Sequence, residues 1–232
     1  MVGLTAAQKR VQGRRPVRSG RPSRERAGEV DERILDAALA VFIERGLAGA
    51  SIDEIAIRAR AGKPTIYARF PGKEALFAAV VLRNVATAIE RFGSNVPSGE
   101  TIDERLANLG KTILDWLLTG NTVDLMRVSI SEAQRLPDLA SNVHRMARQR
   151  GEEVVGRLLS EAAQSEALSA LPAFAPERLA TTARFYIDLV VFPLMTRALF
   201  GEKSESLRAE AGAHVTGRVA FFLAACRHGA FN

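Results

Sequence analysis

The chain has 232 residues, of which 47% are hydrophobic and 25% charged, and this composition fits a globular, mostly helical protein of one large domain or two small ones. The one cysteine, Cys226, excludes an intramolecular disulfide and indicates a reducing compartment. The most apolar run, residues 185–195, is shorter than the ~18–20 residues that cross a bilayer, and it contains Asp188 and Pro193. We therefore expect a soluble, cytoplasmic protein without a membrane span.

The positive charge is concentrated at the amino-terminal end. Residues 1–28 hold eight basic side chains and one acidic one, so they carry +7, and the remaining 204 residues sum to −1. This segment is rich in Gly, Pro, Ser and Arg and has little to bury, which predicts a disordered basic arm that reaches nucleic acid. It contains no apolar core of signal-peptide length, and its glycines and prolines interrupt the amphipathic helix of an organellar leader.

The first predicted helix begins near residue 30 and ends at Gly46. Its apolar residues recur on one face, at Ile34, Ala38, Val41 and Phe42. The sequence Ser51-Ile52-Asp53-Glu54 has the form of a capping box and predicts a second short helix that reaches Ala59. After a turn at residues 60–62, a third helix is expected over about 63–70, with Pro64 tolerated because it lies in the first turn.

A fourth helix is expected from Lys73 to about Phe92, and the polar break at residues 95–99 marks the predicted domain boundary. Beyond it the periodicity remains helical, with a loose segment around Pro172 and Pro176. Further helices are predicted at about 101–119, 122–135, 138–163, 177–200 and 204–228. Since no stretch alternates with period two for long enough to form a strand, the predicted fold class is all-α.

The second and third helices have the spacing of a helix-turn-helix motif over residues 51–70, whose recognition helix enters the major groove. Ala56 and Ala59 are small enough for close helix approach, and a shared core is expected from Ile55, Ile66 and Phe70. The outer face of the third helix would then be free to contact DNA.

The charges of this segment have one sign. Between residues 58 and 73 there are five basic residues and no acidic one. Lys63 and Lys73 each stand at the start of a helical segment, where the macrodipole disfavours a cation, so we expect an external anion such as a phosphate backbone. Thr65 can contact a phosphate or a thymine methyl group, Tyr67 can reach a phosphate with its hydroxyl, and Lys73 would clamp the backbone from the other side.

Three segments together resemble the DNA-binding domain of TetR-family transcriptional regulators. They are Ile34-Leu35-Asp36-Ala37-Ala38 through Phe42 and Gly46, Ser51-Ile52-Asp53-Glu54-Ile55-Ala56, and Thr65-Ile66-Tyr67-Ala68-Arg69-Phe70 with Lys73-Glu74-Ala75-Leu76. The family usually has a turn glycine and a serine N-cap where this chain has Arg60 and Gly62, and Arg60 becomes an additional candidate DNA contact. The predicted DNA-binding residues are Arg60, Lys63, Pro64, Thr65, Tyr67, Ala68, Arg69 and Lys73.

The resemblance implies three parts: the disordered basic arm at 1–28, a DNA-binding domain at 29–95 and, linked through helix four, an effector-binding and dimerisation domain at 96–232. It also implies a homodimer that binds a near-palindromic double-stranded DNA operator. The last helix carries an apolar stripe at Val215, Val219, Phe222 and Leu223. Such a stripe is by itself more typical of a monomer core, but the resemblance favours it as the dimer interface.

A pocket for a small, apolar effector is the other implication of the resemblance. The large or adaptable residues of the middle helices are the candidate lining: Trp116, Met126, Ile130, Phe185, Tyr186, Phe192 and Met195. His144 and Arg145 are candidates for polar contacts, although each also fits an exposed surface position. Pro193, inside a predicted helix, is expected to kink that helix and open local space.

Catalysis is not expected. Gly110-Lys111-Thr112 imitates the end of a phosphate-binding loop, but the position five residues before Gly110 is Arg105 and no strand precedes it. The three histidines lack metal-ligand spacing, and no cofactor or metal is implied. The chain is thus interpreted as a ligand-responsive DNA-binding regulator, most simply a repressor. The rival interpretation is a helical interaction module whose basic arm binds RNA, an acidic protein or a membrane surface.

Overall fold

The structure is a computed structural model that describes residues 24–93, 98–162, 164, 168 and 170–229. Most of the predicted basic arm and most of the predicted boundary at 95–99 therefore lie outside the described residues. Residues 24–28 were expected in the disordered arm, and this prediction was wrong, because they form the first turn of a helix.

The described residues form helices and no strand, as the periodicity predicted. The elements are α1 (Arg24–Gly49), α2 (Ile52–Ala59), α3 (Lys63–Tyr67), α4 (Lys73–Gly93), α5 (Ile102–Leu117), α6 (Gly120–Ser131), α7 (Pro137–Ala162), η1 (Pro172–Phe174), α9 (Leu179–Tyr186), the π-helical segment η2 (Ile187–Val191), α10 (Phe192–Leu199) and α11 (Ser204–Arg227).

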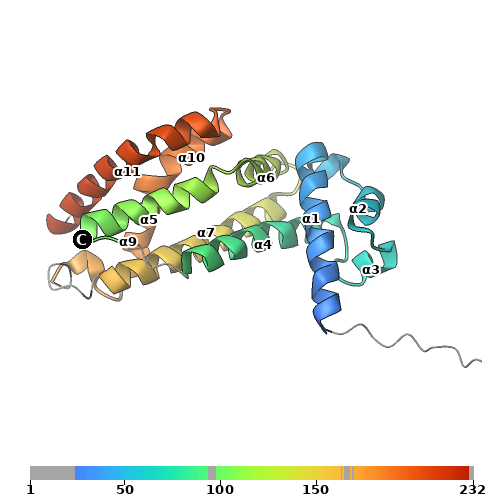
Figure 1. The fold of residues 1–232 in the computed structure, drawn as a ribbon, viewed down its shortest axis with the longest axis horizontal. Helices are drawn as coiled ribbons and strands as arrows, with labels where there is room; N and C mark the ends of the chain where they lie inside the picture. The colour runs from blue at the N-terminus through green and yellow to red at the C-terminus, as the bar shows by residue number, and fades with distance from the viewer. Residues whose placement is uncertain (1–23, 94–97, 163, 165–167, 169, 230–232) are drawn as a thin grey trace, which may run out of the picture.

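The amino-terminal helices pack around one core at one end of an elongated molecule (Figure 1). Phe42 of α1 and Phe77 of α4 are fully buried and meet edge-on, with ring centroids 5.3 Å apart. Gly46 has a φ of 68°, which interrupts the helical backbone of α1 where the sequence predicted its end. The α1–α4 unit thus supplies most of the residues of one hydrophobic core.

The remaining helices form a second core. In Figure 1, α4 and α7 run side by side away from the amino-terminal unit, while α11 lies along α5 on the other flank. Residues of α6, such as Leu125, and of α7, such as Val143, belong to the first core, whereas later residues of α7 belong to the second. Helices α6 and α7 therefore contribute residues to both cores, and α4 packs along α7.

The α9–η2–α10 stretch is one continuous apolar helix with a local change of register. Pro193 has no backbone N–H to donate, and the π-helical turn lies directly before it, where the sequence predicted a kink. The expectation that no apolar run approaches membrane-spanning length needs correction, since Leu179–Leu199 has 21 residues and a mean hydropathy of 1.2 in its best window. Tyr186, Val190 and Leu194 of this helix are buried in the second core, which is the position of a core helix.

Candidate DNA-binding surface and effector cavity

The corner between α2 and α3 is built from local backbone chemistry. Ser51 caps α2 by accepting a hydrogen bond from the Glu54 amide at 3.1 Å, as predicted, whereas the Glu54 carboxylate, expected to complete a capping box, binds Arg58 instead. Arg60 ends α2 in the left-handed conformation (φ 50°, ψ 44°) and is the one non-glycine residue with positive φ in the described part of the chain. Gly62 then begins α3 without a side-chain cap. The departures at these two positions thus preserve the turn, with an arginine in the glycine conformation.

The orientation of α3 is fixed by its buried face. Ile66 is fully buried against Ile55 and the small residues of α2, in the packing that the sequence predicted. Five of the eight predicted DNA contacts at this corner are exposed: Arg60, Lys63, Pro64, Tyr67 and Ala68. The other three, Thr65, Arg69 and Lys73, are partly buried.

The lysines that were expected to require an external anion have partners inside the fold. Lys63 Nζ lies 2.6 Å from Asp53 Oδ1, in a pair whose two side chains are more than half exposed. Lys73 Nζ donates to the backbone carbonyls of Ala48 at 3.0 Å and Ala50 at 3.3 Å, which secures the end of α1 to the start of α4. Their positions at helix starts therefore do not by themselves demand a phosphate, which corrects the sequence argument.

Arg69 was expected on the outer face, and this placement was wrong. Its guanidinium pairs with Asp31 of α1 and donates to the Thr65 carbonyl at 3.2 Å. Arg58 is similarly committed, because it binds Glu44 of α1 at 2.6 Å and Glu54 at 2.6 Å. The hydrogen bond to Glu44 holds the pKa of Arg58 above its usual value and that of Glu44 below. Both arginines orient the motif on α1, and Lys63 and Arg60 carry the exposed charge of its outer face.

One exposed residue beside this surface was missed by the sequence analysis. Ile57 of α2 is 78% exposed, whereas its neighbours Ile55 and Ala56 are buried. An isolated apolar side chain on a short helix gives little periodic signal, so only the placement of α2 on α1 reveals it.

A cavity of about 210 Å³ lies between α4, α5, α6, α7 and the η2–α10 segment. Four of the seven predicted lining residues are on its wall: Trp116, Met126, Phe192 and Met195. Most other wall residues are aliphatic, including Val81, Ile113 and Val155. The wall is therefore predominantly apolar, as a site for an apolar small molecule requires.

The other three predicted lining residues lie elsewhere. Tyr186 is fully buried and its hydroxyl donates to the Leu106 carbonyl at 2.6 Å. Burial also raises the pKa of this phenol well above its ordinary value. Gly110 makes room for the ring, since a Cβ there would lie 2.8 Å from the Tyr186 hydroxyl oxygen. Ile130 is 58% exposed on α6, and Phe185 is also exposed, so neither contacts the cavity.

The polar part of the wall was largely missed. It consists of Asn84, Thr122, Ser129, His144 and Arg148. His144 and Arg145 were the sequence-based candidates for polar contacts. His144 lines the cavity, but the arginine that accompanies it is Arg148, one helical turn later, and Arg145 is not part of the wall. Because residues four apart share a helix face, this spacing could have identified Arg148 as the partner of His144 on the cavity wall. Asn84 Nδ2 donates to Thr122 Oγ1 at 3.3 Å, so α4 and α6 share a polar contact at the wall.

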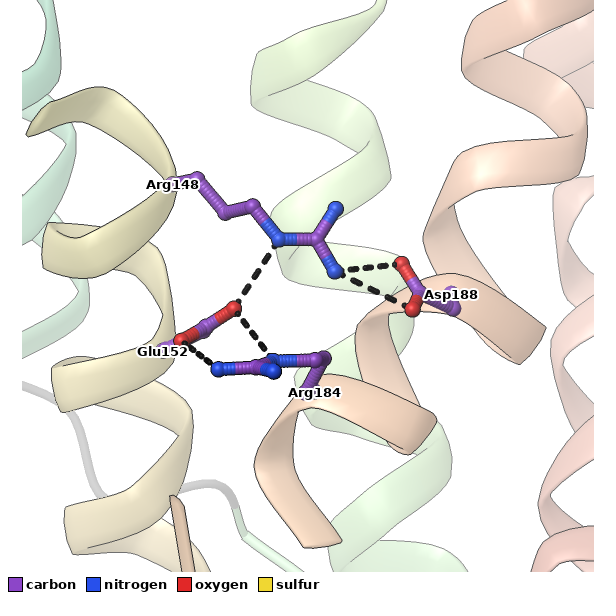
Figure 2. A network of polar contacts seen from close by, with 4 residues as sticks. All are labelled: Arg148, Glu152, Arg184 and Asp188. Carbon is purple, nitrogen blue, oxygen red and sulfur yellow. Dashed lines mark hydrogen bonds and ion pairs between the residues drawn. The ribbon is translucent and has the colours of Figure 1, made fainter. Parts of the chain in front are cut away.

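Arg148 belongs to a four-residue ion network between α7 and the α9–η2 segment (Figure 2). Its Nη2 donates to both carboxylate oxygens of Asp188 at 2.9 and 3.0 Å, and its Nε donates to Glu152 at 3.0 Å. Arg184 binds the same Glu152 carboxylate at 3.2 Å. Burial opposes the charged form of Arg148, but the hydrogen bonds with Asp188 and Glu152 outweigh it and keep its pKa above the usual value.

Helix α6 connects this cavity with the DNA-binding unit. Leu125, Met126 and Ser129 of α6 line the cavity, and Glu132 follows directly at the end of the helix. The Glu132 side chain is 10% exposed, and its Oε1 accepts a hydrogen bond from the Ala48 amide at 3.2 Å. Ala48 is the residue whose carbonyl binds Lys73, so α6, α1 and α4 meet at one point.

The predicted dimer stripe of α11 is part of the monomer core. Its four members are at most 1% exposed and pack against α5 and η2: Val215, Val219, Phe222 and Leu223. They cannot contact a second copy without unfolding, which corrects the assignment of this face. Other apolar residues of this region are exposed: Phe200, directly after α10, to 89%, and Phe221 of α11 to 66%. The small residues Ala213, Gly217 and Ala220 of α11 are exposed as well.

Two family models match the chain in succession. Residues 34–80 match bacterial regulatory proteins of the tetR family, and residues 104–227 match the C-terminal domain of AefR-like transcriptional repressors. The second match alone covers more than half of the chain. This chain belongs to the TetR family of transcriptional regulators. Its members bind DNA and small-molecule effectors, they typically dimerise, and they are not enzymes.

Individual relatives agree with this assignment. The transcriptional repressor SCO4008 of Streptomyces coelicolor is 53% identical over 49 residues, which are 21% of this chain and 26% of that protein, so the matched segment spans about a quarter of the curated relative. A TetR-family transcriptional regulator from Mesorhizobium loti has a solved structure with a TM-score of 0.73 at 26% identity, covering 86% of this chain and 97% of the other. The flavonoid-responsive regulator FrrA gives a TM-score of 0.60 at 28% identity, with coverages of 86% and 97%.

Proposed function

We propose that this TetR-family regulator is a ligand-responsive repressor that binds a near-palindromic operator and is released from it by a small apolar effector. One observation carries the proposal. The exposed face of α3 and the apolar cavity are joined by α4 and α6, each of which lines the cavity and contacts α1. The name of the S. coelicolor relative supports repression, and the name of FrrA supports a response to a small molecule.

The DNA contacts would come from the exposed corner of the helix-turn-helix motif. Lys63 and Tyr67 project from the outer face of α3, and Arg60 stands beside them at the turn. The surface pair between Lys63 and Asp53 is worth little in water, so a phosphate can replace the carboxylate. Thr65, Pro64 and Ala68 would approach the bases, whereas Arg69 and Lys73 would act by holding α3 and α4 in place.

Release would require two conformations that the effector distinguishes by affinity. The cavity is bounded by α4 and α6, so a bound molecule pushes on both helices. Tilting α4 changes the distance between the two recognition helices of a dimer, and the operator then no longer fits both. The contact between Glu132 and Ala48 gives α6 a direct connection to the DNA-binding unit.

The homodimer would form through the outer face of α10 and α11. Phe200 and Phe221 are large apolar side chains that a monomer leaves in water, and the alanines and glycine between them permit close helix approach. We place the DNA-binding domain at about 29–95 and the effector and dimerisation domain at about 96–232. In this arrangement the basic residues before α1 would reach the flanking DNA, in the cytoplasm.

Selection of double-stranded DNA from a random library by the purified full-length protein tests this proposal. We expect enrichment of one near-palindromic sequence that binds two chains per duplex, as measured by sedimentation. Lys63→Ala should weaken binding to it and reduce the slope of log affinity against log salt by roughly one. The matched control is Arg157→Ala, which removes an exposed cation from α7 and should leave affinity unchanged.

Three results would oppose the proposal: no enriched sequence, one chain per duplex, or equal affinities for the Lys63→Ala and wild-type proteins. Tyr67→Phe removes only a hydroxyl from the same face, so it separates a hydrogen bond from the packing of the ring.

A further inference from the structure

Arg148 is the one formally charged residue among the described residues that line the cavity. A guanidinium in an apolar wall is ordinarily the anchor of an anionic ligand, because it binds carboxylates through paired N–H groups. Taken alone, this residue would therefore predict an acidic effector, such as an aromatic or fatty acid.

The surroundings of Arg148 argue against an acid. Figure 2 shows that its Nε and Nη2 already face two carboxylates, Glu152 and Asp188. With Arg184 bound to Glu152, the network holds two cations and two anions and is neutral as a unit. Glu152 is 14% exposed and lies between two arginines, so it cannot turn away into water.

An anion entering the cavity would meet opposing forces of similar size. It could approach the Arg148 guanidinium, but the carboxylates of Glu152 and Asp188 that Arg148 already binds would repel it and offset much of that attraction. The anion would also lose its hydration shell to an apolar wall. Interactions in the cavity therefore compensate for little of the free energy that a carboxylate loses on dehydration.

Resting on the proposed role of the cavity as the effector site, we propose that the effector is uncharged, with an apolar body and a hydrogen-bond acceptor for Arg148, and that Asp188 sets this preference. Among the described residues, the Nη1 group of Arg148 donates to none, so its N–H groups are available for a carbonyl, ether or hydroxyl oxygen. Ser129 also lines the cavity, and because its hydroxyl already donates to the Leu125 carbonyl at 2.9 Å, its oxygen can serve the same ligand as an acceptor. Asp188 neutralises the guanidinium from outside the wall and does not line the cavity.

The test uses ester and acid probes that share a skeleton. Isothermal titration calorimetry of the full-length protein would compare the methyl esters of benzoic, cinnamic and 2-naphthoic acid with the corresponding carboxylates at neutral pH. The three skeletons differ in size, so that the one that best fits the cavity of about 210 Å³ can be identified. For the best-fitting skeleton we expect the ester to bind at least about ten-fold more tightly than its carboxylate.

Asp188→Asn tests the role of the network. It leaves the four-residue network with one net positive charge, so carboxylate affinity should rise about ten-fold while ester affinity changes little. Glu202→Gln is the matched control, because it removes the same charge from an ion pair with Arg197 that does not line the cavity. It should leave the ester-to-acid ratio unchanged, and circular dichroism would confirm that both variants are folded.

The outcomes separate the two proposals. If carboxylates bind the wild-type protein with the same affinity as the corresponding esters, the proposed preference for an uncharged ligand is wrong, although the cavity can still be the effector site. If folded Asp188→Asn has the same ratio of ester affinity to carboxylate affinity as the wild-type protein, Asp188 does not set the preference. If the variant misfolds, the wild-type ratio decides the proposal. If none of the six probes binds, the proposed effector site itself is contradicted.

Discussion

Arg60 holds a backbone conformation that glycine adopts without strain. Its φ of 50° costs an L-residue roughly 1–2 kcal/mol, and glycine avoids that cost although it gains entropy in the unfolded chain. Arg60→Gly should therefore raise the free energy of unfolding by about 0.5–1 kcal/mol, as measured by urea denaturation of the full-length protein.

Arg60→Ala is the control for that substitution. It also removes the guanidinium, but alanine retains the strain of the left-handed conformation, so its stability should stay within about 0.5 kcal/mol of wild type. Both variants should lose similar DNA affinity, since both lose the same charge. A glycine variant no more stable than the alanine variant would contradict the strained turn.

Residue by residue, the sequence predicted what depends on local chemistry. Ser51 caps α2 because capping needs only a hydroxyl and the amide three residues later. Trp116 and Met195 line the cavity, as the sequence predicted, because large apolar side chains of these helices are favoured in the interior or on the wall of a pocket. Lys73, Arg69 and Tyr186 were misplaced because their partners are 23–25, 38 and 80 residues away, and no local pattern encodes such contacts.

Helix α6 makes the clearest prediction at the level of elements. It lines the cavity along its length and ends at Glu132, which binds the Ala48 amide of α1. If this contact transmits the effector signal, Glu132→Ala should preserve operator affinity within about three-fold but reduce the effector-induced loss of affinity by about five-fold or more. Fluorescence anisotropy of the selected operator, with and without a saturating cavity ligand, gives both numbers.

Arg135→Ala is the matched control for the α6 contact. It removes the second partner of Glu132, at 2.8 Å, and leaves the Ala48 hydrogen bond in place. This variant should respond to the effector as the wild-type protein does. Equal coupling in Glu132→Ala and wild type would show that the signal passes through α4 alone.

At the scale of helices, the sequence predicted the boundaries best where a residue type marks the end of a helix. Most predicted boundaries fall within a few residues of the observed ones, because glycines and prolines mark them. The π-helical turn was foreseen only as a kink at Pro193, since a missing donor predicts disruption and leaves open how the register changes. The α11 stripe was correctly periodic, yet periodicity cannot say whether a buried face meets the same chain or a second copy.

In the whole molecule, the helix-turn-helix motif lies at one end (Figure 1), and the cavity lies among α4, α5, α6, α7 and the η2–α10 segment, of which α4 and α6 pack against α1. Helices α6 and α7 contribute residues to both cores, and α4 packs along α7. In the proposed mechanism, a ligand that favours one arrangement of α4 and α6 also favours one arrangement of the DNA-binding unit. If the effector releases the operator as proposed, linkage requires that DNA and effector weaken each other's binding by the same factor.

The most direct test measures both occupancies in one titration. A neutral ester that binds the cavity is added to the full-length protein on its selected, fluorescently labelled operator, while anisotropy reports the DNA and the single tryptophan, Trp116, reports the cavity. We predict that anisotropy falls to the value of free DNA over the same ester concentrations that change the Trp116 emission. DNA that stays fully bound when the Trp116 signal is saturated would contradict the account.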